Sequence, residues 1–394
     1  MKKILFIYPS MIMGGSTTAL ISLLNNLSLN EYEIDLQLYR NEGPLINEIP
    51  SHVNLLPQAD LYPGKIGKVI KIIKFILKGY IFKGIKEKNK KFFSWNALSV
   101  FQVKELSKKN LKEYDYAVGF LEGWSNRYLA FDVKAKKKYA WLHSTFSNIT
   151  SNPKEEVVWM KLVDKIIFVT DACLDKFKEE LPEMACKAIT IENIIDSKIV
   201  RQRSLMIDIK DVQYKKFIEA NCFKIITVCR LTISVKGLDR IVNCVKKLKD
   251  LNRKFIWYII GDGEEKEKLL EMIKKEKIED YLFVIGKRMN PYPFMKEADL
   301  MCMPSRYEGK PIAITEGLIL GIPSIVTEYL SAHEQIKSNI EGIIVKNNDS
   351  SIFEVLDYCV SNQSYVRIMK SNIRRCEYGN KEYIKEIESI LFNN

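Results

Sequence analysis

The feature that most constrains this chain is an alternation of short apolar runs with longer segments of helical character. In the first half, the runs cover residues 3–8, 34–39, 53–56, 115–120, 138–142, 165–169 and 188–191. In the second half, they cover residues 223–229, 255–260, 282–285, 299–303 and 324–327. Short buried strands separated by helices are typical of parallel sheets that are covered by helices on both faces. We therefore expect an α/β fold.

The length of the chain indicates more than one domain. A chain of 394 residues exceeds what one hydrophobic core usually organises, so two domains of ordinary size are expected. An apolar content of 47% and a charged content of 28% are those of a soluble globular protein. We predict a first domain over residues 1–200, a linker over the charged residues 201–221, which lack a clear period, and a second domain over residues 222–375.

Cysteine usage and the N-terminus favour a reducing cytoplasm. The eight cysteines form no C-x-x-C pair and no cluster with histidine, which argues against a zinc site or a disulfide framework. The first residues, MKKILFIYPS, lack the long apolar stretch and the cleavage site of a signal peptide. No apolar run reaches the length of a membrane span. The formal net charge of +12 favours anionic partners.

Most of the excess positive charge lies in one segment, residues 65–91. It contains ten lysines and one glutamate. Helical spacing gathers one set of lysines on one face, with aliphatic residues on the other: Lys65, Lys68, Lys71, Lys74 and Lys78. Such a helix binds anionic lipid headgroups at a membrane surface, although it could also pack on its own domain with solvated lysines. Nucleic acid is disfavoured because aromatic residues do not interleave with the lysines.

Two pairs of charged residues stand after strands of the second half. Arg230 and Lys236 follow the run 223–229, and a guanidinium with an ammonium can clamp a diphosphate. Glu308 lies in a loop after the run 299–303, and Glu316 lies in a helix that starts near residue 312. Carboxylates facing a pocket accept hydrogen bonds from the hydroxyls of sugars. The alternative is that all four are ordinary surface charges.

The combination Arg-x5-Lys-Gly and Glu-x7-Glu resembles the motifs of the retaining nucleotide-sugar glycosyltransferases of family four. Members of that family have the GT-B architecture, two Rossmann-like doubly wound domains that face a central cleft. Residues 193–196, Asn-x-x-Asp, are similar to the sequence that ends the first domain in that family. The resemblance covers nearly the whole chain, and it implies that residues 376–394 form a helix that crosses back to the first domain.

The resemblance implies a role for each residue of these motifs. Arg230 and Lys236 would stabilise the leaving diphosphate, Glu308 would hold the hydroxyls of the sugar, and Glu316 would hold the ribose. Gly309, beside Glu308, would also contact the donor, and the backbone after Gly286 would cradle the nucleotide base. No metal and no cofactor are expected, because the chain has no Asp-x-Asp motif and the nucleotide-sugar is a substrate.

In the first half, glycines and a histidine are candidate site residues. Gly14 and Gly15 open the turn between the first strand and a helix, where backbone amides can approach an anion. His143 follows the run 138–142, and the resemblance implies that it contacts the donor sugar as a catalytic residue together with Arg230, Lys236 and Glu308. Glu122 and Trp124 are weaker candidates for acceptor contact. A plain structural turn and a structural histidine are the alternatives.

One segment departs from the family. Residues 327–334 keep a glutamate but lack the glycine pair that relatives usually have after the preceding strand. The geometry of the loop beside the donor sugar is therefore expected to differ, which leaves the identity of the donor open.

Cysteine usage and the basic segment 65–91 together indicate a cytoplasmic protein that is peripherally associated with the inner face of the cell membrane. The resemblance implies a metal-independent hexosyltransferase. It would move a hexose or N-acetylhexosamine from a nucleotide-diphosphate sugar, with UDP as the first expectation, to a lipid-linked or glycan acceptor. Capsule, other cell-surface polysaccharide or glycolipid synthesis would be the setting. The alternatives are a nucleotide-sugar epimerase of the same architecture and an inactive homologue that binds a partner protein.

Overall fold

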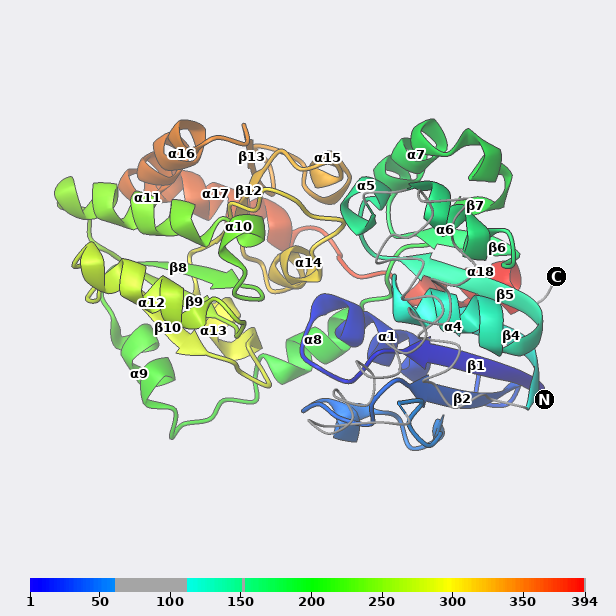
Figure 1. Ribbon diagram of the computed structural model, residues 1–394. Helices are drawn as coiled ribbons and strands as arrows, with labels where there is room; N and C mark the ends of the chain where they lie inside the picture. Colours follow the sequence, from blue (N-terminus) through cyan, green and yellow to red (C-terminus); the bar gives the residue numbers. More distant parts are fainter. Residues whose placement is uncertain (61–111, 151–152, 393–394) are drawn as a thin grey trace, which may run out of the picture. The chain divides into compact units, whose positions relative to one another are not determined.

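The computed structural model describes residues 1–60, 112–150 and 153–392. The chain divides into two compact units (Figure 1), of which unit 1 comprises Met1–Asn193 and Tyr383–Asn394 and unit 2 comprises Ile194–Glu382. The predicted basic helix, residues 65–91 with Lys68, Lys71, Lys74 and Lys78, lies outside the described residues.

Unit 1 is built on a parallel sheet. Its described part contains seven strands in the order β3-β2-β1-β4-β5-β6-β7. The strands are β1 (Lys2–Tyr8), β2 (Tyr32–Leu38), β3 (Asn54–Leu55), β4 (Glu113–Gly119), β5 (Lys134–Leu142), β6 (Lys165–Phe168) and β7 (Ala188–Thr190). The helices are α1 (Gly15–Asn26), η1 (Ile46–Glu48), α4 (Trp124–Asp132), α5 (Phe146–Ile149), α6 (Pro153–Met160), α7 (Asp171–Glu180), η2 (Pro182–Lys187) and α18 (Ile384–Phe392). In β1, every side chain from Ile4 to Tyr8 is buried, as expected for a strand covered on both faces.

The C-terminal helix α18 completes unit 1. Its end is held by two tyrosines of the sheet, because the hydroxyl of Tyr116 donates to the carbonyl of Phe392 at 2.6 Å and that of Tyr139 donates to the carbonyl of Leu391 at 2.6 Å. Glu388 accepts from the backbone N–H and the hydroxyl of Ser28 at 2.7 and 2.9 Å. The last helix of the chain therefore belongs to the same unit as the first strand.

Unit 2, all of whose residues are described, repeats the design with six strands in the order β10-β9-β8-β11-β12-β13. The strands are β8 (Phe223–Val228), β9 (Phe255–Ile260), β10 (Leu282–Gly286), β11 (Leu300–Met303), β12 (Ser324–Thr327) and β13 (Gly342–Val345). The helices are α8 (Ser197–Arg203), α9 (Val212–Glu219), α10 (Ile233–Lys236), α11 (Leu238–Asp250), α12 (Lys266–Lys275), α13 (Tyr292–Glu297), α14 (Ile312–Ile319), α15 (Ala332–Gln335), α16 (Asp349–Ser361) and α17 (Gln363–Arg374), and the 3-10 turn η3 (Lys381–Tyr383) lies at the boundary of the units.

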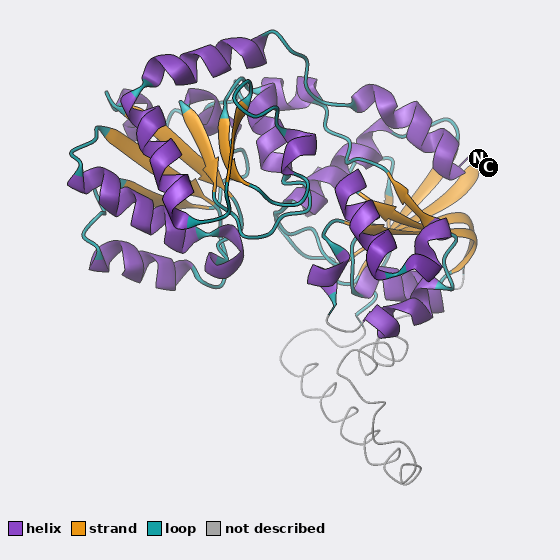
Figure 2. Ribbon diagram, turned by 90° about the horizontal axis from the view of Figure 1, so that it is seen from above, coloured by secondary structure: helices purple, strands orange, loops and turns teal. Residues whose placement is uncertain are grey.

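The sheet of unit 2 has a hydrophobic core on each face. In β8, Ile225 belongs to one cluster and its neighbour Ile226 to the other, because successive side chains of a strand point to opposite faces. Helices α11, α12, α16 and α17 cover the first cluster, and α8, α9, α13, α14 and α15 cover the second. Figure 2 shows the strands of this unit enclosed between helices. The predicted fold class, two Rossmann-like doubly wound domains, is confirmed.

The boundary between the units differs from the predicted linker, residues 201–221. Helix α9 falls within that range, and two of its residues, Tyr214 and Phe217, are buried in the second core cluster of unit 2. The helix is only eight residues long, so its buried face amounts to one pair of aromatic residues at i and i+3. Two apolar residues among charged neighbours are too few to reveal a helical pattern in the sequence.

Gly237 brings the chain that follows β8 close to the chain that follows β11. It joins α10 to α11 with φ 67°, and a Cβ at this position would lie 2.2 Å from the carbonyl oxygen of Pro304. Gly286 has a similar φ of 73° but open space around its Cα. We predict that Gly237→Ala lowers the free energy of unfolding by about 2–4 kcal/mol, and Gly286→Ala by about 1 kcal/mol, because only the first adds a steric clash to the cost of a left-handed conformation. Denaturant titration measures both, and equal losses would contradict the prediction.

Candidate active site

The candidate site of unit 2 lies where the order of its strands reverses. From β8 the chain proceeds outward to β9 and β10, and then returns to β11, which pairs with β8 on its other side. The loops that follow β8 and β11 therefore diverge from neighbouring strands at the same edge of the sheet. Ligands of open α/β sheets bind at such a switch point. The two predicted cations follow β8, and the two predicted carboxylates follow β11.

Lys236 and Glu308 are in direct contact. The Nζ of Lys236 lies 2.6 Å from Oε1 and 2.9 Å from Oε2 of Glu308, and the hydroxyl of Ser305 donates to the same Oε1 at 2.7 Å. The Lys236 side chain is 20% exposed and that of Glu308 is 9% exposed. The structure thus brings together one predicted cation and one predicted carboxylate, as an ion pair with one side open to solvent.

The loop that carries Glu308 is fixed by hydrogen bonds from the last residue of β12 and from the segment after it. The hydroxyl of Thr327 donates to the carbonyl of Ser305, and the hydroxyl of Ser331 donates to the carbonyl of Gly309. The amide of Gln335 donates to the carbonyl of Pro311 at 2.8 Å. Thr327 and Ser331 belong to residues 327–334, the segment that lacks the expected glycine pair, and their buried hydroxyls hold the loop.

Glu316 is buried in α14, where its Oε1 accepts a hydrogen bond from the hydroxyl of Tyr292 at 2.7 Å. The guanidinium of Arg203 lies over the ring of Tyr292, 5.7 Å from its centroid. Burial raises the pKa of the Glu316 carboxyl, and the Tyr292 hydrogen bond and the charge of Arg203 oppose that shift only in part. Sequence reasoning missed Tyr292, because nothing in the local sequence indicates that its hydroxyl reaches Glu316.

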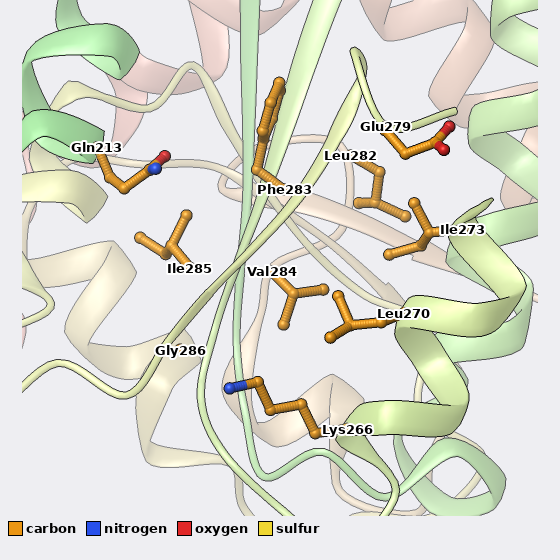
Figure 3. A pocket seen from close by; sticks show the side chains of 10 residues that line it. All are labelled: Gln213, Lys266, Leu270, Ile273, Glu279, Leu282, Phe283, Val284, Ile285 and Gly286. Carbon is orange, nitrogen blue, oxygen red and sulfur yellow. The ribbon is translucent and has the colours of Figure 1, made fainter. Parts of the chain in front are cut away.

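The remaining predicted residues of unit 2 are less closely engaged. Arg230 is exposed in the loop after β8, and its guanidinium forms no ion pair with the described parts of the chain. Gly286 ends the edge strand β10 and lines a cavity of about 390 Å³ between β10, α12 and α9 (Figure 3). The other residues lining this cavity are not among the predicted site residues: Gln213, Lys266, Leu270, Ile273, Glu279, Leu282, Phe283, Val284 and Ile285.

Unit 1 has its own switch point between β1 and β4, which pair although β2 and β3 intervene in the chain. Gly14 and Gly15 follow β1, and Gly15 is the first residue of α1. The hydroxyl of Tyr8 lies 2.7 Å from that of Ser16, which ties the first turn of the helix to the end of the strand. The predicted strand, glycine turn and helix are therefore present at the edge where the candidate residues were expected.

His143 follows β5 at the same edge and contacts Glu122, which follows β4. The backbone N–H of His143 donates to Oε2 of Glu122 at 2.9 Å. Burial lowers the pKa of His143 to about 4 and raises that of the Glu122 carboxyl. The Nε2 of His143 is buried and has no hydrogen-bond partner among the residues that the structure describes. His143 is therefore a neutral imidazole at neutral pH, with one ring nitrogen available.

Trp124 packs rather than projecting freely, because its ring stacks on Tyr128 at 4.8 Å and lies 5.0 Å from the ring of Tyr39. Within the described ranges, no three His, Cys, Asp or Glu side chains gather in a way that could hold a metal ion.

No helix in the described part of the chain has both the length and the apolar character that crossing a bilayer requires.

Comparisons with known proteins find that parts of this chain are similar to glycosyltransferases. Residues 209–375 match the model of the family "Glycosyl transferases group 1". The O-antigen biosynthesis glycosyltransferase WclY of Escherichia coli is 26% identical over 138 residues, which cover 35% of this chain and 38% of the relative. A UDP-Gal:alpha-D-GlcNAc-diphosphoundecaprenol alpha-1,3-galactosyltransferase of Escherichia coli is 26% identical over 136 residues, covering 34% and 35%. The chain spans less than half the length of these curated relatives.

Solved structures match over the whole length. Anabaena Alr3699/HepE in complex with UDP and glucose superposes with a TM-score of 0.71 at 15% identity, covering 99% of both chains. WaaG, a glycosyltransferase involved in lipopolysaccharide biosynthesis, gives a TM-score of 0.61 at 14% identity, covering 99% of this chain and 100% of WaaG. At these identities the likeness establishes the fold alone. Residues 209–375 thus resemble the group 1 glycosyl transferases, and the chain as a whole has the GT-B fold of two Rossmann-like domains.

Proposed function

We propose that this chain is a retaining glycosyltransferase of family four. It would transfer a hexose or N-acetylhexosamine from a nucleotide-diphosphate sugar, with UDP as the expected nucleotide, to a hydroxyl of a membrane-associated acceptor. The observation that carries the proposal is the pairing of Lys236 with Glu308 at the switch point of unit 2. The pair places an ammonium, which can bind a diphosphate, beside a carboxylate, which can accept hydrogen bonds from sugar hydroxyls.

In the proposed reaction, Lys236 and Arg230 stabilise the negative charge that develops on the leaving diphosphate. An ammonium has three N–H donors, and the two oxygens of Glu308 engage two of them, so the third is left for a phosphate oxygen. Arg230 is exposed and adds a planar guanidinium suited to the same anion. The bond from the sugar to the diphosphate breaks while the bond to the acceptor oxygen forms on the same face, and the acceptor proton passes to the departing phosphate.

The two carboxylates are proposed to orient the donor. Glu308 accepts three hydrogen bonds from Lys236 and Ser305, and a carboxylate offers about four lone-pair sites, so it keeps capacity for one sugar hydroxyl. Glu316 is proposed to accept from the ribose, with Tyr292 holding the carboxylate in place. In unit 1, the available ring nitrogen of the neutral His143 suits a sugar hydroxyl, and the amides at Gly14 and Gly15 suit an anionic group.

We further propose that the transfer needs no metal ion, because two cations are supplied by the chain where the diphosphate charge grows. The galactosyltransferase relative uses UDP-Gal, which supports a UDP-sugar donor for this chain. Its acceptor is a sugar on diphosphoundecaprenol, which supports a lipid-linked acceptor. An acceptor in a membrane also agrees with the basic sequence of residues 65–91, whose Lys68, Lys71, Lys74 and Lys78 would face anionic headgroups. Peripheral association with the inner face of the cell membrane would follow.

Substitution of the two cations tests the proposal. Once a donor is identified by thermal shift with a panel of UDP-sugars, we predict that Lys236→Ala and Arg230→Ala each lower the rate of transfer to a membrane-lipid extract by about 10²–10³-fold, because stabilisation of the leaving group is lost. Lys246→Ala is the matched control, since Lys246 forms a 2.6 Å ion pair with Glu276 between α11 and α12. Chelation of divalent ions is expected to leave the wild-type rate unchanged.

Two outcomes of this assay would contradict the proposal. A transfer rate of Lys236→Ala close to that of wild type would show that the Lys236–Glu308 ion pair does not stabilise the leaving diphosphate. Consumption of the donor at the same rate without any acceptor would instead indicate the epimerase that shares this architecture. The configuration of the new linkage, read by NMR spectroscopy, decides between retention and inversion.

Glu316→Gln tests whether the buried carboxylate lowers the free energy of unfolding. Because burial raises the folded-state pKa of Glu316, wild-type stability falls as pH rises from the unfolded-state pKa, near 4.5, through the folded-state value. A neutral glutamine avoids this loss and can still accept from Tyr292. We predict that Glu316→Gln unfolds at a higher denaturant concentration than wild type at pH 7.5, and that the difference shrinks toward pH 4.5.

The same variant is expected to bind the nucleotide about ten- to a hundred-fold more weakly, because an NH₂ group replaces one of the two oxygens that would accept hydrogen bonds from the ribose. Denaturant titration at the two pH values and calorimetry with UDP measure the two effects. Lower stability at every pH, or undiminished nucleotide binding, would contradict the assigned role.

A further inference from the structure

The connection between α8 and α9 carries a run of aliphatic side chains that are exposed to solvent. The exposed fractions are 65% for Leu205, 64% for Met206, 44% for Ile207, 70% for Ile209 and 72% for Val212. Figure 1 shows this connection as a long loop between the two helices. Single exposed aliphatic residues are common on protein surfaces, but a contiguous group marks a surface that binds something. We call residues 204–212 the apolar loop.

The backbone of the apolar loop is fixed by polar contacts to the loop that follows β10. The amide of Asn290 donates to the carbonyls of Arg203 and Met206 at 2.7 and 3.3 Å. Arg203 donates to the carbonyl of Met289 at 2.9 Å, and Arg288 pairs with Asp211 at 2.9 Å. Because both ends of the apolar loop are anchored in this way, its aliphatic side chains are held outward rather than folding back onto the core.

Exposed cations outnumber exposed acids on the apolar loop and its flanking helices. Arg201, Lys210, Lys215 and Lys216 are exposed on the loop or on the flanking helices. The exposed acidic residues of the same stretch are fewer: Asp208 and Glu219. Met289, on the loop that anchors the backbone, adds a further side chain that is 43% exposed. An aliphatic tip with a cationic rim complements a lipid bilayer, in which acyl chains lie beneath anionic headgroups.

We propose that the apolar loop is a membrane-docking element. Leu205, Ile207 and Ile209 enter the boundary between headgroups and acyl chains, and the surrounding cations contact anionic headgroups. A second copy of the chain fits this surface less well, because a twofold contact through the loop would bring its lysines near those of the partner. The use of such a contact, to reach a membrane-linked acceptor, rests on the proposed function, but lipid binding itself does not depend on catalysis.

Vesicle binding by the full chain tests the proposal. The loop variant is Leu205→Ser, Ile207→Ser and Ile209→Ser combined. The matched control combines the same changes at three separate exposed aliphatic residues of unit 2, which are 50%, 49% and 59% exposed: Leu251→Ser, Ile340→Ser and Ile368→Ser. Residues 65–91 are unchanged in every protein, so the comparison isolates the loop.

We expect the loop variant to partition into vesicles of phosphatidylglycerol and phosphatidylcholine about ten-fold less than wild type, and the control to match wild type. Vesicles of phosphatidylcholine alone are expected to bind wild type more weakly, because the headgroup charge is removed. Both variants should keep the wild-type unfolding temperature.

Three results would overturn the proposal. In the first, the wild-type protein does not bind the mixed vesicles. In the second, the loop variant binds them as well as the control variant does. In the third, the wild-type protein is a dimer and the loop variant is a monomer. The last would identify a second copy of the chain as the occupant. No donor or acceptor is present in this experiment, so a failure of the glycosyltransferase assignment would leave its result unchanged.

Discussion

The reversal of strand order between β8 and β11 is the constraint on which the candidate site depends. It brings two loops that are about seventy residues apart in sequence to the ends of neighbouring strands, where Lys236 and Glu308 meet at 2.6 Å. The ammonium and the carboxylate neutralise each other's charge, and each still has one hydrogen-bonding site for a ligand: one N–H donor on Lys236 and one lone pair on Glu308. The pair can therefore exist before a ligand arrives and still bind one.

The site is assembled at some expense of stability. Glu316 is buried in α14 with its pKa raised, and it is supported mainly by the hydroxyl of Tyr292. The Glu308 loop is held by hydrogen bonds from Ser331, in the segment that lacks the glycine pair expected from the family resemblance, and from Gln335 in α15. Buried polar side chains that fix a loop limit its conformations. Side-chain hydrogen bonds thus define the geometry of this loop, which was expected to differ from that of the family because the glycine pair is absent.

The sequence was enough to predict the fold, because most strands contain a short stretch of buried apolar side chains between helical segments. It was not enough for β13 (Gly342–Val345), which was not predicted, or for α9, whose burial rests on Tyr214 and Phe217. Motif spacing identified which loops carry the charges, but it could not show that Lys236 contacts Glu308 or that His143 is neutral. Those facts depend on rotamers and burial set by residues distant in sequence, such as Tyr292.

A crystal structure of the chain with bound UDP would show directly whether Lys236 and Glu316 hold the nucleotide. We predict that the diphosphate contacts the Nζ of Lys236 and that the ribose hydroxyls contact the carboxylate of Glu316, at the ends of β8 and β11. UDP bound away from these side chains, for example in the cavity beside β10 without contact to Lys236, would contradict this prediction.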